Sequence, residues 1–440
     1  MNNTPHQKNI IHGSIMAGGN VHIGDIIYNI ERDFKSGSIL FLRLDKKDET
    51  RYEAHLSVKS KHSDKGTLVT SGEKWCEQIK VTIPPQLFDE VADFQAFRRN
   101  RDAQTRYKDI LRPDNHNIQA IENKLAQQIY DTFFSGEIGK VCGDFIRLLE
   151  EQRIEELLLE ISADEAAIVN LPFEMVLPLF FPPKLGEAKK SLARNNFGLV
   201  RTTIPSLDAF DMQGNHATAA PLKMLFITAL PENLDERGKM LQIEEEQTRL
   251  IQSIGALEAT GDTKPQIVIE FLDNASLAEL NKALHARQHD IVHISGHGAY
   301  QAAENKGVLY FENQDGDEEQ VSGKALGETL RQHGCVKLLI LSACETAMAG
   351  SEGGVTEQAA AFGVPSIVAM RFAVTDEGAK VFTTELYTQL ATGLSRTRAL
   401  GYAREALHRD ITQRREHAPQ SPILPNGSRP CCIKISWSGR

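Results

Sequence analysis

A histidine and a cysteine in the C-terminal half of the chain each stand just past an apolar run, 344 − 297 = 47 residues apart. His297 lies between two glycines after DIVHIS, and Cys344 follows VKLLILSA. A thiol is mostly protonated near pH 7, so it needs a base, and an imidazole can take that proton and later return it to a leaving amine. These residue types predict a dyad for acyl transfer, with Cys344 as the nucleophile and His297 as the general base.

The elements around the two residues predict how they meet. After residue 220, near-continuous apolar strands alternate with amphipathic helices, a pattern typical of βα units and a mostly parallel sheet covered on both faces. We expect DIVHIS to end at the glycine and VKLLILSA to end at Cys344, so that both ends reach one edge of the sheet. The amides of Gly298 and Cys344 are then placed to donate to an oxyanion, a contribution of ~3 kcal/mol each.

The alternative interpretation is that His297 and Cys344 each have only a structural role. A buried cysteine at a strand end is usually inert packing, and a histidine beside glycine usually has a structural role. The other cysteines lack CxxC spacing, so no zinc site or other metal site is expected; they are Cys76, Cys142, Cys335, Cys431 and Cys432. The absence of P-loop, HExxH and GxSxG motifs removes support for NTPases, zincins and serine hydrolases, and no cofactor is expected.

The rest of the chain divides by composition. Gly, Asn, Ile and Val are enriched in a segment over residues 1–35, and polar, irregular sequence over 206–220 predicts a linker. Between them, 36–205 carries three predicted strands, two helices, a further helix end and strand, and a loop marked by prolines 178, 182 and 183. We therefore expect an association segment, an N-terminal half, a linker and a catalytic half over 221–440.

Composition narrows the class of protein. Of 440 residues, 59 are acidic and 49 basic, and the net charge of −10 argues against a nucleic-acid partner bound through bulk charge. Six cysteines are too few for a disulfide scaffold, and no apolar run approaches the ~20 residues of a membrane span. The N-terminus lacks the pattern of an export signal. We expect a cytoplasmic protein with no membrane partner.

The two motifs resemble a known family. HISGHG and LSACETAMAG are similar to the signature motifs of the CHAT domain, a group of caspase-like cysteine peptidases related to caspases and separase. Further similar segments, among them LLLEISADEAAIVNLPFEMVLP and NNFGLVRTTIP, extend the resemblance over about residues 38–415. It implies an α/β fold with a caspase-like, mostly parallel sheet flanked by helices, and a divergent, non-catalytic N-terminal half that is itself caspase-like.

The resemblance also implies an activity and a site. The chain would be a cysteine endopeptidase (a thiol protease) in which His297 is the base, Cys344 the nucleophile, and Gly298 and Cys344 the oxyanion donors. Asp376 is similar to the separase-type position that receives a P1 arginine, where a carboxylate would select a basic residue. The competing role, which we favour, is a cap on the helix that begins DEGAKVF.

The tail departs from the family pattern. Relatives generally close with a tryptophan-led strand that adds to the sheet, whereas the tail here carries prolines at 418, 422, 425 and 430. We therefore expect the final strand to be replaced, shortened or disordered.

The N-terminal segment carries a second resemblance. Its strand-like core, formed by Asn20, Val21, His22, Ile23 and Gly24, is similar to the RHIM-like amyloid signalling motifs of bacterial and fungal immune proteins. The resemblance implies recruitment by an upstream sensor or adaptor through stacked strands, and cleavage of a protein effector, such as a gasdermin-like one, in antiviral defence or regulated cell death. An ordinary N-terminal strand or flexible tail is the alternative.

Two other functions stay open at this point. One is a caspase-like pseudoenzyme or scaffold that assembles signalling complexes through its N-terminal motif. The other is a different α/β enzyme, such as a hydrolase of small amides or nucleotides.

Overall fold

The computed structural model describes the chain in segments. These are residues 37–60, 74–104, 115–181, 195–203, 221–235, 241, 243–259, 267–273, 275–301, 303–304, 306–343, 346, 354–370, 376–417 and 433–438. The predicted N-terminal association motif, the predicted linker over 206–220 and Cys344 lie outside them.

The N-terminal part builds three antiparallel strands, then helices, then two parallel strands. In chain order its elements are β1 (Gly37–Lys46), β2 (Arg51–Ser60), β3 (Lys74–Thr82), α2 (Pro85–Gln104), α3 (Asn115–Phe133), α4 (Gly136–Glu150), β4 (Glu156–Ala163), α5 (Ala166–Val169), η1 (Phe173–Val176), α6 (Leu177–Phe180) and β5 (Phe197–Thr203). The predicted strands and helices of this part are confirmed. The loop expected at Pro178 is wrong, because that proline is the second residue of the short helix α6, and an N–H in the first turn has no partner within the helix.

The C-terminal part alternates strands and helices, as its apolar pattern predicts. Its elements are β6 (Leu222–Ala229), α8 (Glu232–Asp235), α9 (Ile243–Ala259), β7 (Ile267–Leu272), α10 (Leu277–Ala286), β8 (Ile291–Gln301), β9 (Lys306–Glu312), β10 (Glu318–Ser322), α11 (Gly323–His333), β11 (Leu338–Ser342), α12 (Val355–Ala361), β12 (Ser366–Met370), α13 (Asp376–Ala391), α14 (Arg396–His417) and β13 (Ile433–Ser438).

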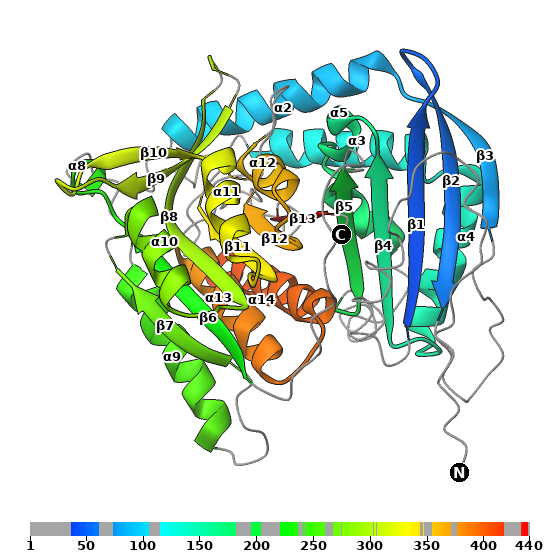
Figure 1. The fold of residues 1–440 in the computed structure, drawn as a ribbon. Coiled ribbons are helices and arrows are strands. Elements are labelled where there is room, and N and C mark those ends of the chain that lie inside the picture. Colours follow the sequence, from blue (N-terminus) through cyan, green and yellow to red (C-terminus); the bar gives the residue numbers. More distant parts are fainter. Residues whose placement is uncertain are drawn as a thin grey trace, which may run out of the picture.

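All described strands join one sheet. Figure 1 shows β1–β5 on one side, β6–β12 on the other, and β13 between the two groups. Its order is β7-β6-β8-β11-β12-β13-β5-β4-β1-β2-β3, and the β9–β10 hairpin continues from β8. Seven of the twelve described pairings are parallel. The expectation of an α/β protein with a mostly parallel sheet flanked by helices is confirmed.

The C-terminal strand corrects an expectation. Residues Ile433–Ser438 form β13, which pairs antiparallel with β12, Trp437 opposite Ser366, and parallel with β5, Ser438 opposite Thr203. The expected replacement or disorder of this strand is therefore wrong. The four prolines of the tail precede β13, and the inner edges of β12 and β5 supply the backbone partners that a six-residue strand needs.

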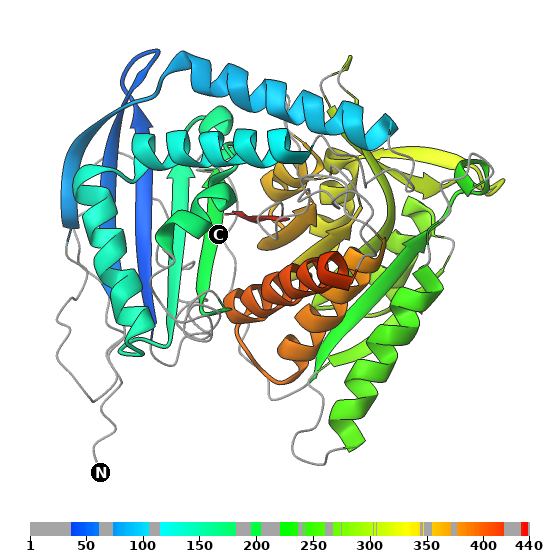
Figure 2. The ribbon, with the colours of Figure 1, turned by 180° about the vertical axis from the view of Figure 1, so that it is seen from behind.

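Helices cover both faces of the C-terminal part. Helices α9, α13 and α14 lie on one face, in front in Figure 2, and α10, α11 and α12 lie on the other, in front in Figure 1. Two apolar cores follow this division: Phe226 and Leu250 belong to the first, and Leu225 and Leu280 to the second. Of the helices that the structure describes, none combines the length and apolar character needed to cross a membrane.

Helix α14 packs against both parts of the sheet. Ser395 Oγ, just before the helix, donates to Glu156 Oε1 on β4 at 2.6 Å, and Arg398 Nε donates to Asn196 Oδ1 at 3.0 Å. A Cβ at Gly401 would lie 2.2 Å from the carbonyl oxygen of Asn195, so the close approach of the helix to this segment requires glycine. The two parts are thus joined by a helix as well as by β13.

A buried ion pair links the segment after β4 to β5. Arg201 and Glu174 form a salt bridge with both side chains at most 1% exposed, and Arg201 Nη1 also donates to the carbonyl oxygen of Val169 at 3.4 Å. Such a pair adds little net stability over a packed apolar pair, but losing one partner leaves a buried charge.

We therefore expect Arg201→Met to lower the free energy of unfolding in urea by about 3–5 kcal/mol. The matched control is Lys124→Met, which breaks an exposed pair with Glu90 (3.0 Å) and should cost less than about 1 kcal/mol. Equal losses in the two variants would contradict the role given to the buried pair.

Candidate active site

His297 lies where β8 leaves the main sheet. Up to Gly296 the strand pairs in parallel with β6, and up to Ser295 with β11. From His297 onward it pairs antiparallel with β9, His297 opposite Tyr310 and Gly298 opposite Leu309. The expected end of the strand at the glycine is wrong: β8 runs on to Gln301 because the β9–β10 hairpin supplies a partner. An Asp-Gly turn signal at Asp315 was available in the sequence and was missed.

The glycine before His297 has a packing role. Gly296 is opposite Ala229 of β6, and a Cβ there would lie 2.8 Å from the carbonyl oxygen of Ala229. The two backbones approach too closely for any other residue, so Gly296 fixes the course of β8 directly before the histidine. His297 and Gly298 are half-buried.

The ladder between β8 and β11 has a constant offset. Leu338 is opposite Ile291 and Ser342 is opposite Ser295, so 338 − 291 and 342 − 295 both equal 47 residues. In the sequence, His297 follows Ser295 by two positions and Cys344 follows Ser342 by two, which is the same offset. Because Cys344 lies outside the described residues, the dyad and its oxyanion donors stay predictions.

Polar side chains line the sheet one pleat before His297, and sequence reasoning missed them. Thr228 of β6 and Ser342 of β11 are both opposite Ser295 in the ladders. Ser295 Oγ donates to Glu246 Oε2 of α9 at 2.8 Å, and Gln247 Nε2 donates to Thr228 Oγ1 at 2.9 Å. Interior positions of a parallel sheet are usually apolar, so this row of hydroxyls marks the approach to the candidate site.

A second histidine on β8 is excluded as the base. His293 is fully buried, its ring stacks on Phe226 with centroids 4.3 Å apart, and its Nδ1 lies 2.9 Å from Tyr387 Oη. Burial lowers the pKa of His293 to about 3, so the ring is neutral at pH 7 and closed to substrate. Burial, with the Glu246 charge, raises the pKa of Tyr387 well above its ordinary value.

The start of α13 is held by charged groups of α9. Arg249 pairs with both carboxylate oxygens of Glu377, its Nη2 lying 3.1 Å from Oε2, and the buried Lys380 pairs with Glu245. The hydrogen bond to Lys380, then that to Arg249, lowers the pKa of Glu245. Asp376 is the first residue of this helix, and its side chain is not among those described.

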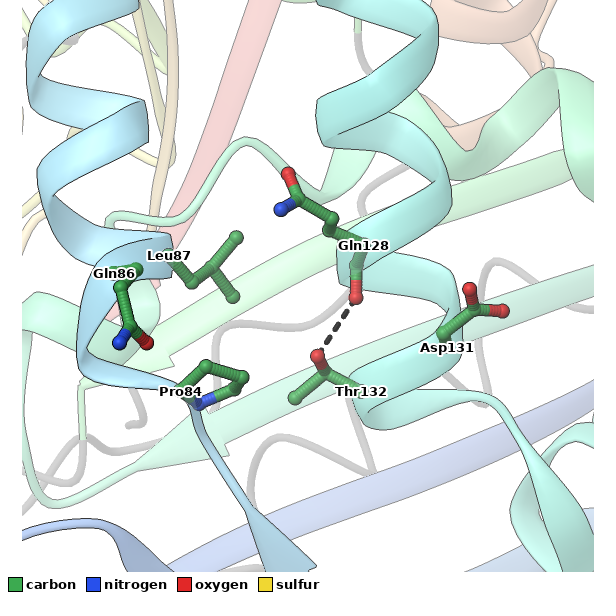
Figure 3. A pocket seen from close by; sticks show the side chains of 6 residues that line it. All are labelled: Pro84, Gln86, Leu87, Gln128, Asp131 and Thr132. Atoms are coloured by element: carbon green, nitrogen blue, oxygen red, sulfur yellow. Dashed lines mark hydrogen bonds between the residues drawn. The ribbon is translucent and has the colours of Figure 1, made fainter.

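A hollow in the N-terminal part lies on other elements. It has a volume of about 280 Å³ and is shown in Figure 3 between the start of α2 and the end of α3; its lining is Pro84, Gln86, Leu87, Gln128, Asp131 and Thr132. None of these residues belongs to β8 or β11, so the hollow is separate from the candidate site. Within the described segments, no three His, Cys, Asp or Glu side chains are grouped to hold a metal ion.

Comparison with known proteins identifies the family. The CHAT domain matches residues 123–423, so the chain belongs to the CHAT domain family. A comparison with curated proteins finds no match.

Solved structures also match, among them two crystal structures of the Saccharomyces cerevisiae separase–securin complex. One has 11% identity and a TM-score of 0.46, covering 94% of this chain and 30% of that one. The other has 12% identity and a TM-score of 0.32, with coverages of 81% and 23%. The chain thus spans less than a third of the length of these relatives.

The low pKa of His293 predicts a pH dependence of stability. Below the ordinary value of 6.5 the unfolded chain binds a proton at this position and the folded chain does not, so stability falls as pH falls. Between pH 7 and pH 5 this group should lower the free energy of unfolding by about 2 kcal/mol. In His293→Leu, urea titrations at pH 7 and pH 5 should lack this difference of about 2 kcal/mol in the free energy of unfolding. The same pH dependence in His293→Leu as in the wild-type chain would contradict the low pKa of His293.

Proposed function

We propose that the chain is a cysteine endopeptidase with Cys344 as nucleophile and His297 as general base. The observation that carries the proposal is the constant offset of the β8–β11 ladder, which equals the separation of the two residues in the sequence. Membership of the CHAT family supports the same reading of the two motifs.

The chemistry follows from the two side chains. His297 takes the thiol proton, the sulfur of Cys344 bonds to the substrate carbonyl carbon, and the oxyanion accepts hydrogen bonds from the amides of Gly298 and Cys344. Collapse breaks the C–N bond, and the protonated His297 gives its proton to the leaving amine. Water, deprotonated by the same imidazole, then hydrolyses the thioester and releases the thiol.

Two roles for Asp376 are compatible with its place at the start of α13. We propose first that its carboxylate caps the helix, where an anion is favoured. The second role is recognition of a basic P1 side chain. In either role, the pairing of Arg249 with Glu377 supports the proposal, because it holds the adjacent residue of the helix against α9.

The substrate and setting belong to the same proposal. We propose a protein effector, such as a gasdermin-like one, cleaved in the cytoplasm during antiviral defence or regulated cell death. The N-terminal motif would recruit an upstream sensor or adaptor with a matching motif.

Labelling of Cys344 tests the activity. A peptidyl acyloxymethyl ketone library should label the wild-type chain and the Cys335→Ala control, because Cys335 is a half-buried free cysteine that precedes β11, whereas Cys344 follows the strand. Cys344→Ala should lose the label, and His297→Ala should reduce its rate by about 100-fold or more. Equal weak labelling of wild type and Cys344→Ala would instead favour a pseudoenzyme scaffold.

Deletion of residues 1–35 tests the recruitment. We expect signalling in cells to fall, while the rate of Cys344 labelling and the thermal midpoint of the purified chain stay unchanged, because the segment precedes the first described strand. Ile23→Lys should reproduce the loss by placing a charge in the stacked core. Full signalling by both variants would contradict the motif.

A further inference from the structure

One face of β8 carries three polar side chains at alternate positions. Side chains two apart on a strand point to the same face, so His293, Ser295 and His297 share one. Val292 and Ile294 alternate with these residues along the strand and belong to the apolar core on the opposite face. His293 is 0% and Ser295 is 3% exposed, so both polar groups are desolvated, at a cost that must be offset by hydrogen bonds.

The hydroxyl of Ser295 has a hydrogen-bond partner on α9. It donates to Glu246 Oε2 at 2.8 Å, and Glu246 is itself only 4% exposed. Glu246 Oε1 lies 3.9 Å from Nε2 of His293. This carboxylate therefore contacts β8 at the two positions that precede His297 on its own face.

Helix α9 is a rigid support for this contact. Leu250 and Ile254 are buried in the core beneath the sheet, and Arg249 and Glu245 are paired with residues of α13. A hydrogen bond from such a support fixes the strand, because the helix cannot follow a displaced strand without breaking its other contacts.

We infer that Glu246 and Ser295 are positioning residues for His297: the hydrogen bond between them holds β8 in place one pleat before the imidazole. The inference rests on the proposed function, in which His297 accepts the thiol proton. At Gly296 the strand has no side chain to pack, and from His297 onward β9 replaces β6 and β11 as its described partner. The Ser295–Glu246 bond is the last described side-chain anchor before that change on this face.

A misplacement of a reacting group by about 1 Å can cost on the order of 100-fold in rate. Loss of the anchor should therefore slow the chemical step and leave the affinity for a peptidyl probe unchanged. A role confined to stability would leave the chemical step intact.

The test compares variants of the full chain by the kinetics of Cys344 modification with the peptidyl acyloxymethyl ketone, resolved into kinact and KI. Ser295→Thr keeps the hydroxyl group. Ser295→Val has nearly the same shape as the threonine variant but lacks the hydroxyl. We expect the kinact of Ser295→Thr to stay within about twofold of the wild-type value. The kinact of Ser295→Val should fall by about 10- to 100-fold, and KI should be unchanged in both variants.

A second pair of variants separates positioning from stability. Glu246→Met removes the acceptor and should match Ser295→Val. Gln247→Met is its neighbour on α9 and removes a bond to Thr228 of the adjacent strand, so it should lower the thermal midpoint but keep kinact.

Equal kinact in the Thr and Val variants, or equal losses in Glu246→Met and Gln247→Met, would overturn the inference. If wild type shows no labelling that depends on Cys344, the proposed function fails instead, and the two failures are distinguished by that first measurement.

Discussion

The parallel pairing of β8 with β6 and β11 is the constraint on which the candidate site depends. A slip of one residue in this ladder would turn every side chain of β8 to the other face. That slip is opposed by burial on both faces, because Ile291 packs in one core and Val292 and Ile294 in the other. The hydrophobic pattern of residues 291–296 therefore decides which face of the sheet His297 occupies. The position of the imidazole depends in this way on how the two apolar cores pack.

Polar groups beneath this ladder are a cost that the rest of the structure offsets. His293, Ser295 and Thr228 occupy interior positions where a parallel sheet usually carries aliphatic residues. Each has a partner on α9 or α13 at 2.8–2.9 Å, so the desolvation is compensated and the helices are tied to the strands. Departures from a purely apolar interior are expected near functional sites. Here two of the three polar residues, His293 and Ser295, lie on β8 shortly before His297.

Local sequence patterns predicted the parts of the fold that local physics controls. The alternation of apolar strands with amphipathic helices after residue 220 predicts the βα order, and the two motifs identify His297 and Cys344 as candidate site residues. The β9–β10 hairpin was missed although its Asp-Gly turn was visible. Local sequence patterns could not predict the position of β13 in the sheet or the Ser295–Glu246 hydrogen bond, because both join segments far apart in the chain.

The position of β13 gives the N-terminal part a physical role in the fold. The strands β6, β7, β8, β11 and β12 run in one direction, whereas β13 is antiparallel to β12 and parallel to β5. Without β13, the backbone groups of β12 on that side would lose their described partners. Without β5, the other side of β13 would become an unpaired edge, which invites association with other chains. Strand β12 leads toward α13, whose first turn contains Asp376 and Glu377. The N-terminal part therefore supports β12 through β13, because β5 pairs with the other side of β13. Ser395 and Arg398 at the start of α14 hold the same junction from one face.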